Sequence, residues 1–281
     1  MKLNLFKYYA PKYNGEYNLS FYEKGQIYFQ KPERFNDPWD CKAPKIVIPR
    51  QVGFLRDFHF YISRMHGDVW AREAWNRIKN LPRPQIRETY RNLFDEALEN
   101  IRKKIGVFSL SFVPDSELMW SHYAESHTGY MLHFEIVTEY YLTDHLMTDI
   151  GVPIPVIYKT QRHNINIASY HSNPEKNIYD LIRFKSNAWS YEYELRLINE
   201  KKFGFISYPN SWLKSITLGI ASEEKLKEKL ISIGNELNLS VFFAEIDKEH
   251  FKINIPGLNI DGSKGHKSYN EIVSTKIIEL K

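Results

Sequence analysis

The sequence predicts an α+β protein with mixed or antiparallel central sheets, flanking helices and a helical insert near residues 51–104. Short segments with the apolar and polar pattern of strands recur from residue 3 to the end of the chain. Residues 51–104 instead place apolar residues at helical spacing. Because no repeat and no convincing linker interrupts the 281 residues, we expect a single domain over 1–281 that carries this insert.

Glycine, proline and polar turn residues bound most of the predicted elements. We expect strands over residues 3–9, 26–30, 107–111, 129–135, 153–158, 192–198, 202–207, 215–219, 240–245 and 276–280. We expect helices over residues 19–24, 52–65, 68–79, 84–104, 115–125, 174–188 and 223–237. Asn18 and Asp115 are the predicted caps of the helices that follow them, and Gly25 and Gly106 end two helices.

The composition is that of a globular protein, with 43% hydrophobic and 26% charged residues. No uncharged apolar stretch approaches the roughly 18 residues that a membrane span needs. The N-terminus lacks the apolar region and cleavage site of a signal peptide. The single cysteine, Cys41, excludes an intramolecular disulfide and a multi-cysteine zinc site. We therefore expect a cytoplasmic protein that does not enter a membrane.

The net charge of +4 and the pI of about 8.8 are mildly basic, and the basic residues are interleaved with acidic ones. The longest basic clusters, 102–104 and 201–202, are short. This pattern indicates solvated surface charge rather than a nucleic-acid footprint. The chain holds 19 tyrosines, and such a surplus of aromatic rings suits a site that stacks planar ligands.

The loop over 31–40 contains two prolines and an Asn-Asp-Pro triplet, so we expect neither helix nor strand there. Residues 34–40 combine an amide, two carboxylates, a guanidinium and two aromatic rings. Asn36 and Asp37 either hydrogen-bond the loop backbone, as in ordinary turns, or present contacts to a ligand or a metal ion. Both interpretations stay open at this point.

The helix over 115–125 carries Trp120, His122 and Tyr123 close together. If it continues to His127, then Trp120, Tyr123 and His127 lie on one face. His122 points elsewhere and is a candidate acid, base or substrate contact, because the charge state of an imidazole is easily tuned. The alternative is a helix that packs its aromatic rings into the core and leaves His122 partly exposed.

Strand periodicity divides the segment 189–196 into two faces. One face carries Tyr191, Tyr193 and Leu195, and the other carries Glu192, Glu194 and Arg196. We expect repulsion to favour protonation of one carboxylate, whereas Arg196 favours ionisation of the other. Such a pair suits a reaction through an oxocarbenium-like centre, in which one carboxylate stabilises the cation and the other takes a proton from the nucleophile. The alternative is a solvated strand face with a surface ion pair. Ser109 and Ser111, two hydroxyls on one strand face, are a weaker signal.

Six motifs follow one another along the chain and together resemble the bacterial domain of unknown function 2971. They are Phe6-Lys7-Tyr8, Gly25-Gln26-Ile27-Tyr28-Phe29, Phe35-Asn36-Asp37-Pro38-Trp39-Asp40, Ser109-Leu110-Ser111, Met119-Trp120-Ser121-His122-Tyr123-Ala124 and Trp189-x-Tyr191-Glu192-x-Glu194-x-Arg196. The resemblance covers nearly the whole chain apart from the helical insert and about the last twenty residues. The family label carries no settled activity.

A fainter resemblance is to the ADP-ribosyltransferase fold, whose arginine-type members carry an early basic residue, a Ser-x-Ser strand and a late Glu-x-Glu. Lys7, Ser109-Leu110-Ser111 and Glu192-Tyr193-Glu194 occur here in that order, with Lys7 in place of the family's arginine. The resemblance implies that NAD⁺ is the substrate, that Glu194 is the catalytic carboxylate and that Glu192 activates the acceptor. It also implies that Tyr8 or Tyr28 stacks the nicotinamide ring.

Three hypotheses about function follow. The first is an ADP-ribosyltransferase-like enzyme that uses NAD⁺ to modify a protein, a nucleic acid or water, in a toxin or phage-defence role. The second is a metal-dependent nucleic-acid-processing protein, in which Asp37, Asp40, Glu192 and Glu194 supply an oxygen-rich metal shell. The third is a sensor of a nucleotide or another small ligand that binds without turnover.

Overall fold

The structure is a computed structural model that describes residues 2–42, 46–47, 63, 67–137, 150–162, 165–166 and 174–274. The chain divides into two compact units. The first unit comprises Met1–Lys31, Ile105–Val156 and Ala188–Glu279, and the second comprises Pro32–Lys104, Ile157–Asn187 and Leu280–Lys281. The predicted insert, residues 51–104, thus lies within the second unit. That unit also contains residues 32–50 and, from later in the sequence, residues 157–187.

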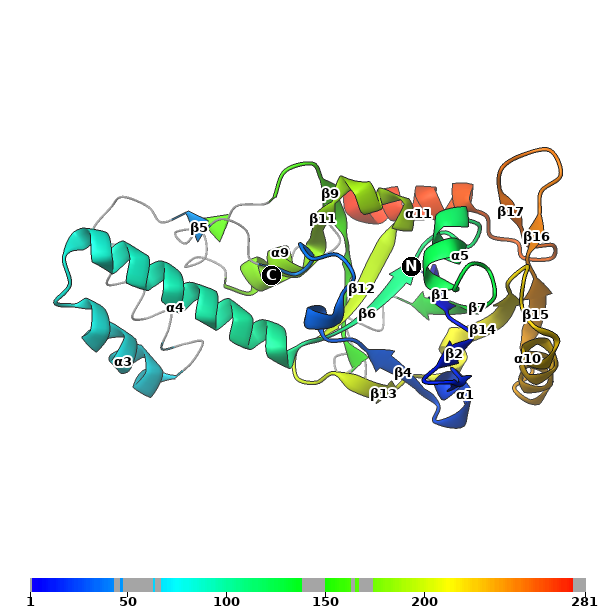
Figure 1. Cartoon of the computed structure of the whole chain (residues 1–281), viewed down its shortest axis with the longest axis horizontal. Helices are drawn as coiled ribbons and strands as arrows, with labels where there is room; N and C mark the ends of the chain where they lie inside the picture. Colours follow the sequence, from blue (N-terminus) through cyan, green and yellow to red (C-terminus); the bar gives the residue numbers. More distant parts are fainter. Residues whose placement is uncertain are drawn as a thin grey trace. The chain divides into compact units, whose positions relative to one another are not determined.

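The first unit is built on a seven-stranded mixed sheet, which confirms the predicted α+β class (Figure 1). Its strands, in spatial order, are β15 (Ser240–Phe243), β14 (Leu213–Leu218), β7 (Tyr130–Val137), β1 (Lys2–Tyr9), β6 (Gly106–Ser111), β12 (Glu194–Asn199) and β8 (Val152–Pro155). Only β14 and β15 pair in parallel, and all other neighbours are antiparallel.

The two faces of this sheet differ in chemistry. Residues paired across strands point to the same face, and side chains alternate between faces along each strand. One face carries the aromatic core around Phe108 and Phe134, whose rings meet edge to face at 6.0 Å. The opposite face carries Phe6, which pairs with Ser111 on β6, and Ser111 in turn pairs with Glu194 on β12. This second face also carries the buried apolar cluster that includes Phe6, Tyr8 and Met131. We call it the polar face after the Ser111 and Glu194 side chains.

Short elements surround the sheet of the first unit. Its helices are α1 (Ser20–Glu23), α5 (Glu117–Tyr123), α10 (Glu224–Glu236) and α11 (Gly262–Ser274), with 3₁₀ turns η2 (Asn187–Glu192) and η3 (Asn210–Trp212). Three two-stranded ribbons pair β2 (Lys12–Tyr13) with β3 (Glu16–Tyr17), β4 (Gln26–Phe29) with β13 (Gly204–Ser207), and β16 (Glu245–Ile246) with β17 (Ile253–Asn254).

The second unit contains two helices of the predicted insert, α3 (Asp68–Ile78) and α4 (Arg83–Lys104), as expected over 68–79 and 84–104. It also contains η1 (Pro32–Arg34), β5 (Ile46–Val47), β9 (Ile157–Lys159), β10 (Ile165–Asn166), α9 (Pro174–Arg183) and β11 (Phe184–Ser186). The pairs β5–β10 and β9–β11 are parallel. Across the described ranges, no helix combines the length and apolar character that a membrane span requires.

Several predicted boundaries are wrong for identifiable reasons. The helix expected over 174–188 ends at Arg183, because residues 184–186 pair with β9 instead. The strand expected over 153–158 divides at Val156 into β8 and β9, which pair with different partners. The loop over 31–40 includes one 3₁₀ turn, η1. The helix expected over 52–65, apart from Ser63, and the strand expected over 276–280 lie outside the described residues.

Helix α11 was not predicted from the sequence, because the glycines at 262 and 265 disfavour a helix. Both glycines are required by close packing. A Cβ atom at Gly265 would lie 2.0 Å from the carbonyl oxygen of Phe112, and one at Gly262 would lie 2.5 Å from a carboxylate oxygen of Asp115. Asp115 therefore accepts a hydrogen bond from the Gly262 amide at 3.0 Å rather than capping α5, which is capped by Ser116. Similarly, α1 begins after Leu19 without the predicted Asn18 cap.

Protonation of His133 is expected to destabilise the first unit as the pH falls. Burial, and secondarily the nearby Lys214, lower the pKa of His133 to about 4, although Glu135 opposes the shift. Because the unfolded chain takes up this proton near pH 6.5, stability is complete above that pH and is lost as the pH falls toward 4. The expected loss between pH 7.5 and pH 5 is about 2 kcal/mol.

Urea unfolding at several pH values measures this contribution. Replacing His133 by glutamine should remove about 2 kcal/mol of the acid-dependent loss, whereas the same change at the exposed His122 should leave it in place. If the free energy of unfolding fell equally with pH in the wild type and in His133→Gln, the loss could not be assigned to His133.

Candidate functional site

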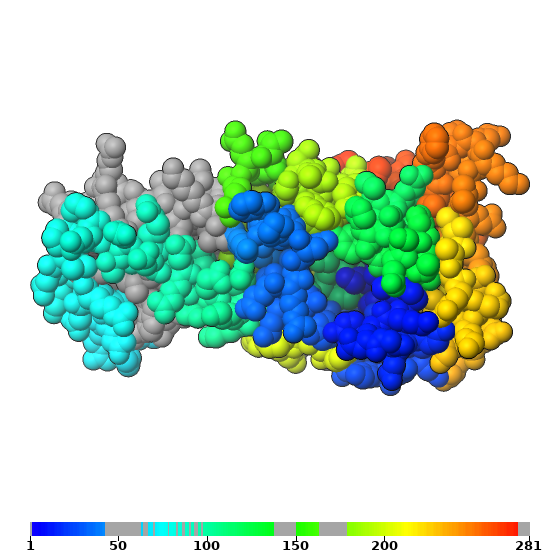
Figure 2. All heavy atoms as spheres, in the orientation of Figure 1, coloured from blue at the N-terminus to red at the C-terminus, as the bar shows by residue number. Residues whose placement is uncertain are grey.

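The candidate site lies on the polar face of the first unit, where β6 and β12 meet the segment that joins η2 to β12. Helix α5 contributes His122 and Tyr123, and the η2–β12 segment contributes Tyr191, Glu192 and Glu194. Hydrogen bonds link the two segments, which are about 70 residues apart in the sequence. In the space-filling view the α5 region, coloured green, lies at the molecular surface (Figure 2).

A buried ion pair occupies the start of β12. The Arg196 guanidinium donates two hydrogen bonds to the Glu194 carboxylate, at 2.8 and 3.1 Å. Arg196 is fully buried and Glu194 is 4% exposed. In the antiparallel register they stand opposite Ser109 and Ser111. This forked, charge-assisted geometry fixes the orientation of the carboxylate far more firmly than the surface pair considered from the sequence.

Glu192 does not share a strand face with Glu194, so the predicted strand over 192–198 is wrong at its start. Residues 187–192 form the 3₁₀ turn η2, and Tyr193 adopts a left-handed backbone with φ of 43° before β12 begins. The Tyr193 ring stacks on His266 of α11 at 4.0 Å and meets Tyr269 edge to face at 5.2 Å. Helix α11 therefore supports the turn that separates the two carboxylates.

Glu192 has its own set of partners. The Tyr123 hydroxyl donates a hydrogen bond to the Glu192 carboxylate at 2.6 Å, and the Ser111 hydroxyl donates to the Glu192 main-chain oxygen at 2.6 Å. Glu192 is 3% exposed. Ser111 thus holds the backbone of the site, while Ser109, opposite Arg196, is half-buried. A phenol thus donates a hydrogen bond to the Glu192 carboxylate, and a guanidinium donates to the Glu194 carboxylate.

Helix α5 places one functional candidate at the surface and another in the core. His122 is exposed, and its Nδ1 lies 2.9 Å from the Tyr191 hydroxyl. Trp120 is fully buried and donates from its indole nitrogen to the Pro114 carbonyl at 2.9 Å, so it packs the core. The proposed common face with His127 is wrong, because the helix ends at Tyr123 and His127 has a positive φ of 67°.

Three of the predicted ligand contacts do not join this site. Lys7 is one residue from Phe6 on β1 and lies over the Phe108 ring, on the opposite face of the sheet. Tyr8 is buried in the core, where its hydroxyl donates to the Val113 carbonyl at 2.7 Å and burial raises its pKa well above the usual value. Tyr28 belongs to the β4–β13 ribbon and packs edge to face on Phe205.

From Pro32 on, the loop over 31–40 belongs to the second unit. Several of its polar side chains make hydrogen bonds or ion pairs within the same unit. Asn36 accepts a hydrogen bond from the Asp37 amide, and Asp37 accepts one from the Trp39 amide at 2.8 Å. Asp40 lies 3.7 Å from Lys185, and both side chains are buried. The second carboxylate oxygen of Asp37 is buried without a hydrogen-bond partner among the described residues. No group of three or more His, Cys, Asp or Glu in the described segments is arranged to hold a metal ion.

Sequence reasoning missed two contributors to the site. Tyr191 belongs to the motif at 189–196, but the predicted strand placed its side chain on the face opposite to the carboxylates. In the structure Tyr191 lies in η2, and its hydroxyl contacts His122. His266 lies in α11, a helix that was not predicted because it contains Gly262 and Gly265. A positive φ at the tyrosine between two glutamates leaves no sequence signal, because tyrosine is not a residue that favours that conformation.

Fold and site together define an α+β protein with two buried, separately held carboxylates on the polar face of a mixed sheet. Residues 119–197 match the family described as Protein of unknown function (DUF2971). This match confirms the resemblance found in the sequence, and the matched segment contains His122, Tyr123, Glu192, Glu194 and Arg196. No significant match was found among curated proteins or among solved structures.

Proposed function

We propose that the protein is an ADP-ribosyltransferase-like enzyme that uses NAD⁺ to modify a macromolecule. The observation that carries the proposal is that Glu192 and Glu194, two residues apart, are both buried carboxylates, with Tyr123 donating a hydrogen bond to the first and Arg196 to the second. A transfer through a cationic sugar needs one carboxylate fixed in its charged form and a second that accepts a proton. The Ser-x-Ser strand that this fold class carries lies directly beside the Glu194–Arg196 pair.

In the proposed reaction the bond between nicotinamide and C1′ of the ribose breaks, and its electron pair leaves with nicotinamide. Glu194, oriented by Arg196, stabilises the resulting oxocarbenium ion electrostatically. The acceptor then forms a bond to C1′, and its proton passes to Glu192.

In this proposal the nicotinamide ring stacks on Tyr191 rather than on Tyr8 or Tyr28. Tyr191 is half-buried, and Trp189 lies 6.1 Å from it between ring centroids. Its hydroxyl is held by His122 at 2.9 Å, so the orientation of the phenol is fixed by a side chain at the surface. An aromatic ring of this kind provides a face on which nicotinamide stacks. In this proposal His122 positions Tyr191 rather than acting as the acid or base.

Transfer of label from NAD⁺ labelled in its adenylate half tests the proposal. The purified chain is incubated with labelled NAD⁺ and, in separate reactions, protein extract, RNA and DNA, each once with Mg²⁺ and once with EDTA. Label that becomes attached to one class of acceptor supports the transferase and identifies the acceptor. Cleavage of nucleic acid that requires a divalent metal, without transfer of label, would favour the nuclease hypothesis instead.

Replacing Tyr123 by phenylalanine is expected to slow transfer by about tenfold, because the Glu192 carboxylate loses its phenolic donor. Since Tyr123 is only half-buried and the ring remains, the unfolding midpoint should change little. The matched control is Tyr22→Phe, which removes a phenol that donates to the exposed Glu236 of α10. A slowed reaction in the control, or an unchanged one in Tyr123→Phe, would contradict this role.

A further inference from the structure

The second unit contains a pocket of about 250 Å³ whose lining is basic and aromatic. The described lining residues include four cationic side chains, Lys42, Lys159, Arg162 and Lys185, and one carboxylate, Asp180. Asp180 lies 3.8 Å from Arg183, and Lys185 lies 3.7 Å from Asp40. The pocket therefore presents a surplus of positive charge, which favours an anionic ligand.

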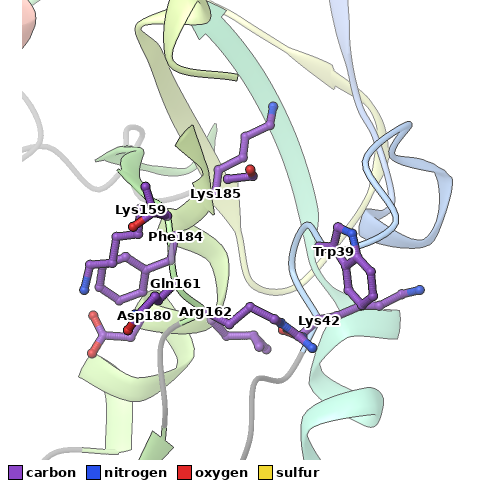
Figure 3. Close-up of a pocket in the computed structure, with 11 residues that line it drawn as sticks. Trp39, Lys42, Lys159, Gln161, Arg162, Asp180, Phe184 and Lys185 are labelled. Atoms are coloured by element: carbon purple, nitrogen blue, oxygen red, sulfur yellow. The ribbon is translucent and has the colours of Figure 1, made fainter. Parts of the chain in front are cut away.

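Two aromatic rings stand on opposite sides of this pocket. Figure 3 shows Phe184 with Lys159 on one side, Trp39 with Lys42 on the other, and Arg162 extending between them. Lys159 lies over the Phe184 ring at 3.9 Å, and the Arg162 guanidinium lies over the Trp39 ring at 5.2 Å. Trp39 is 61% exposed, so its side chain is accessible from solvent.

The position of Arg162 suits recognition of a phosphate group. Its guanidinium is placed by the Trp39 ring and by a hydrogen bond to the Lys42 carbonyl at 3.4 Å. A guanidinium stacked on a ring still directs its in-plane N–H groups outward, where they match the oxygen atoms of a phosphate. Lys42 and Lys159, both exposed, add point charges on either side. The exposed ring of Trp39 offers a surface on which a planar base stacks.

We propose that this pocket binds a phosphorylated nucleoside, with the phosphate held by Arg162, Lys42 and Lys159 and the base stacked on Trp39. A volume of about 250 Å³ suits a mononucleotide rather than a dinucleotide. The ligand is either a free mononucleotide or one nucleotide of a single strand, since both present the same base and phosphate. The pocket is lined by residues of the second unit, whereas Glu192 and Glu194 belong to the first unit.

Isothermal titration calorimetry of the full chain with AMP, adenosine and inorganic phosphate tests this site. AMP should bind, and adenosine should bind at least tenfold more weakly because it lacks the phosphate. Arg162→Ala should weaken AMP binding by about tenfold. Trp39→Ala should weaken AMP binding more than it weakens phosphate binding, because the ring both stacks the base and helps to place Arg162. The control is Lys79→Ala, an exposed cation of the same unit that does not line the pocket and should have no effect.

A 5′-phosphorylated tetranucleotide of single-stranded RNA distinguishes the two sources of the ligand. Tighter binding than AMP, with the same dependence on Arg162 and Trp39, assigns the pocket to a strand, and equal or weaker binding assigns it to a free nucleotide. The proposal is overturned if neither AMP nor the tetranucleotide binds, if adenosine binds as well as AMP, or if Lys79→Ala weakens binding as much as Arg162→Ala. Because the readout is binding without turnover, it does not depend on the transferase proposal.

Discussion

Replacing Arg196 by methionine is expected to lower the free energy of unfolding by about 3–5 kcal/mol. The guanidinium is fully buried and donates hydrogen bonds of 2.8 and 3.1 Å to Glu194, which is itself 4% exposed. Removing the guanidinium breaks an ion pair in an environment that water hardly reaches, and loss of one partner of a buried ion pair is strongly destabilising. Urea unfolding of the variant and the wild type measures the difference.

The matched control is Lys227→Met in α10, which breaks an exposed ion pair with Glu224 at 3.3 Å. That change should alter stability by less than about 0.5 kcal/mol, as expected for a surface pair. The double replacement of Glu194 and Arg196 by leucine and methionine should recover much of the loss, because replacing both members of a buried ion pair by apolar residues of similar volume is often close to neutral. A single variant at Arg196 as stable as the wild type would contradict the buried pair.

Replacing Glu192 by glutamine is expected to reduce transfer to the macromolecular acceptor by about 100-fold, because general base catalysis typically contributes a factor of this order or more. Release of nicotinamide should fall much less, since Glu194 and Arg196, which favour the oxocarbenium ion, remain in place. Quantifying labelled acceptor and free nicotinamide in the same reaction separates the two steps. Glutamine also keeps the acceptor oxygen for the Tyr123 hydroxyl, so the fold should be retained.

Equal loss of transfer and of nicotinamide release in Glu192→Gln would contradict the division of labour between the carboxylates. Asp247→Asn provides a control at a carboxylate of the same unit that lies outside the site, near the exposed His250 and Lys252. It should leave both products unchanged.

Much of the fold follows from local pattern. Strands β1, β4 and β6 lie within one residue of the ranges expected from alternation, and α3 and α4 match the helical spacing of the insert. The elements that failed are those in which tertiary contacts outweigh local preference. Residues 184–186 leave the predicted helix because β9 offers hydrogen bonds to them, and α11 tolerates two glycines because only glycine fits against Phe112 and Asp115.

The candidate site could be predicted in composition but not in geometry. The motifs around His122 and Glu192 supplied candidate residues, and the structure joins α5 and η2 by hydrogen bonds. The strand assumed at Glu192 was wrong because a left-handed residue at Tyr193 depends on stacking against His266, which is 73 residues away in the sequence. Lys7 lies on the face of the sheet opposite to Glu194, a position that order along the chain does not specify.

Nicotinamide release by the purified chain is the most direct test of the central claim that Glu194 takes part in NAD⁺ chemistry. The chain is incubated with NAD⁺, with and without acceptors, alongside Glu194→Gln, whose amide oxygen retains a hydrogen bond to Arg196. Folding of both proteins is checked by urea unfolding. The account predicts release by the wild type that falls at least 100-fold in Glu194→Gln. Absence of release under every condition by the folded wild type, or equal release by the variant, would contradict it.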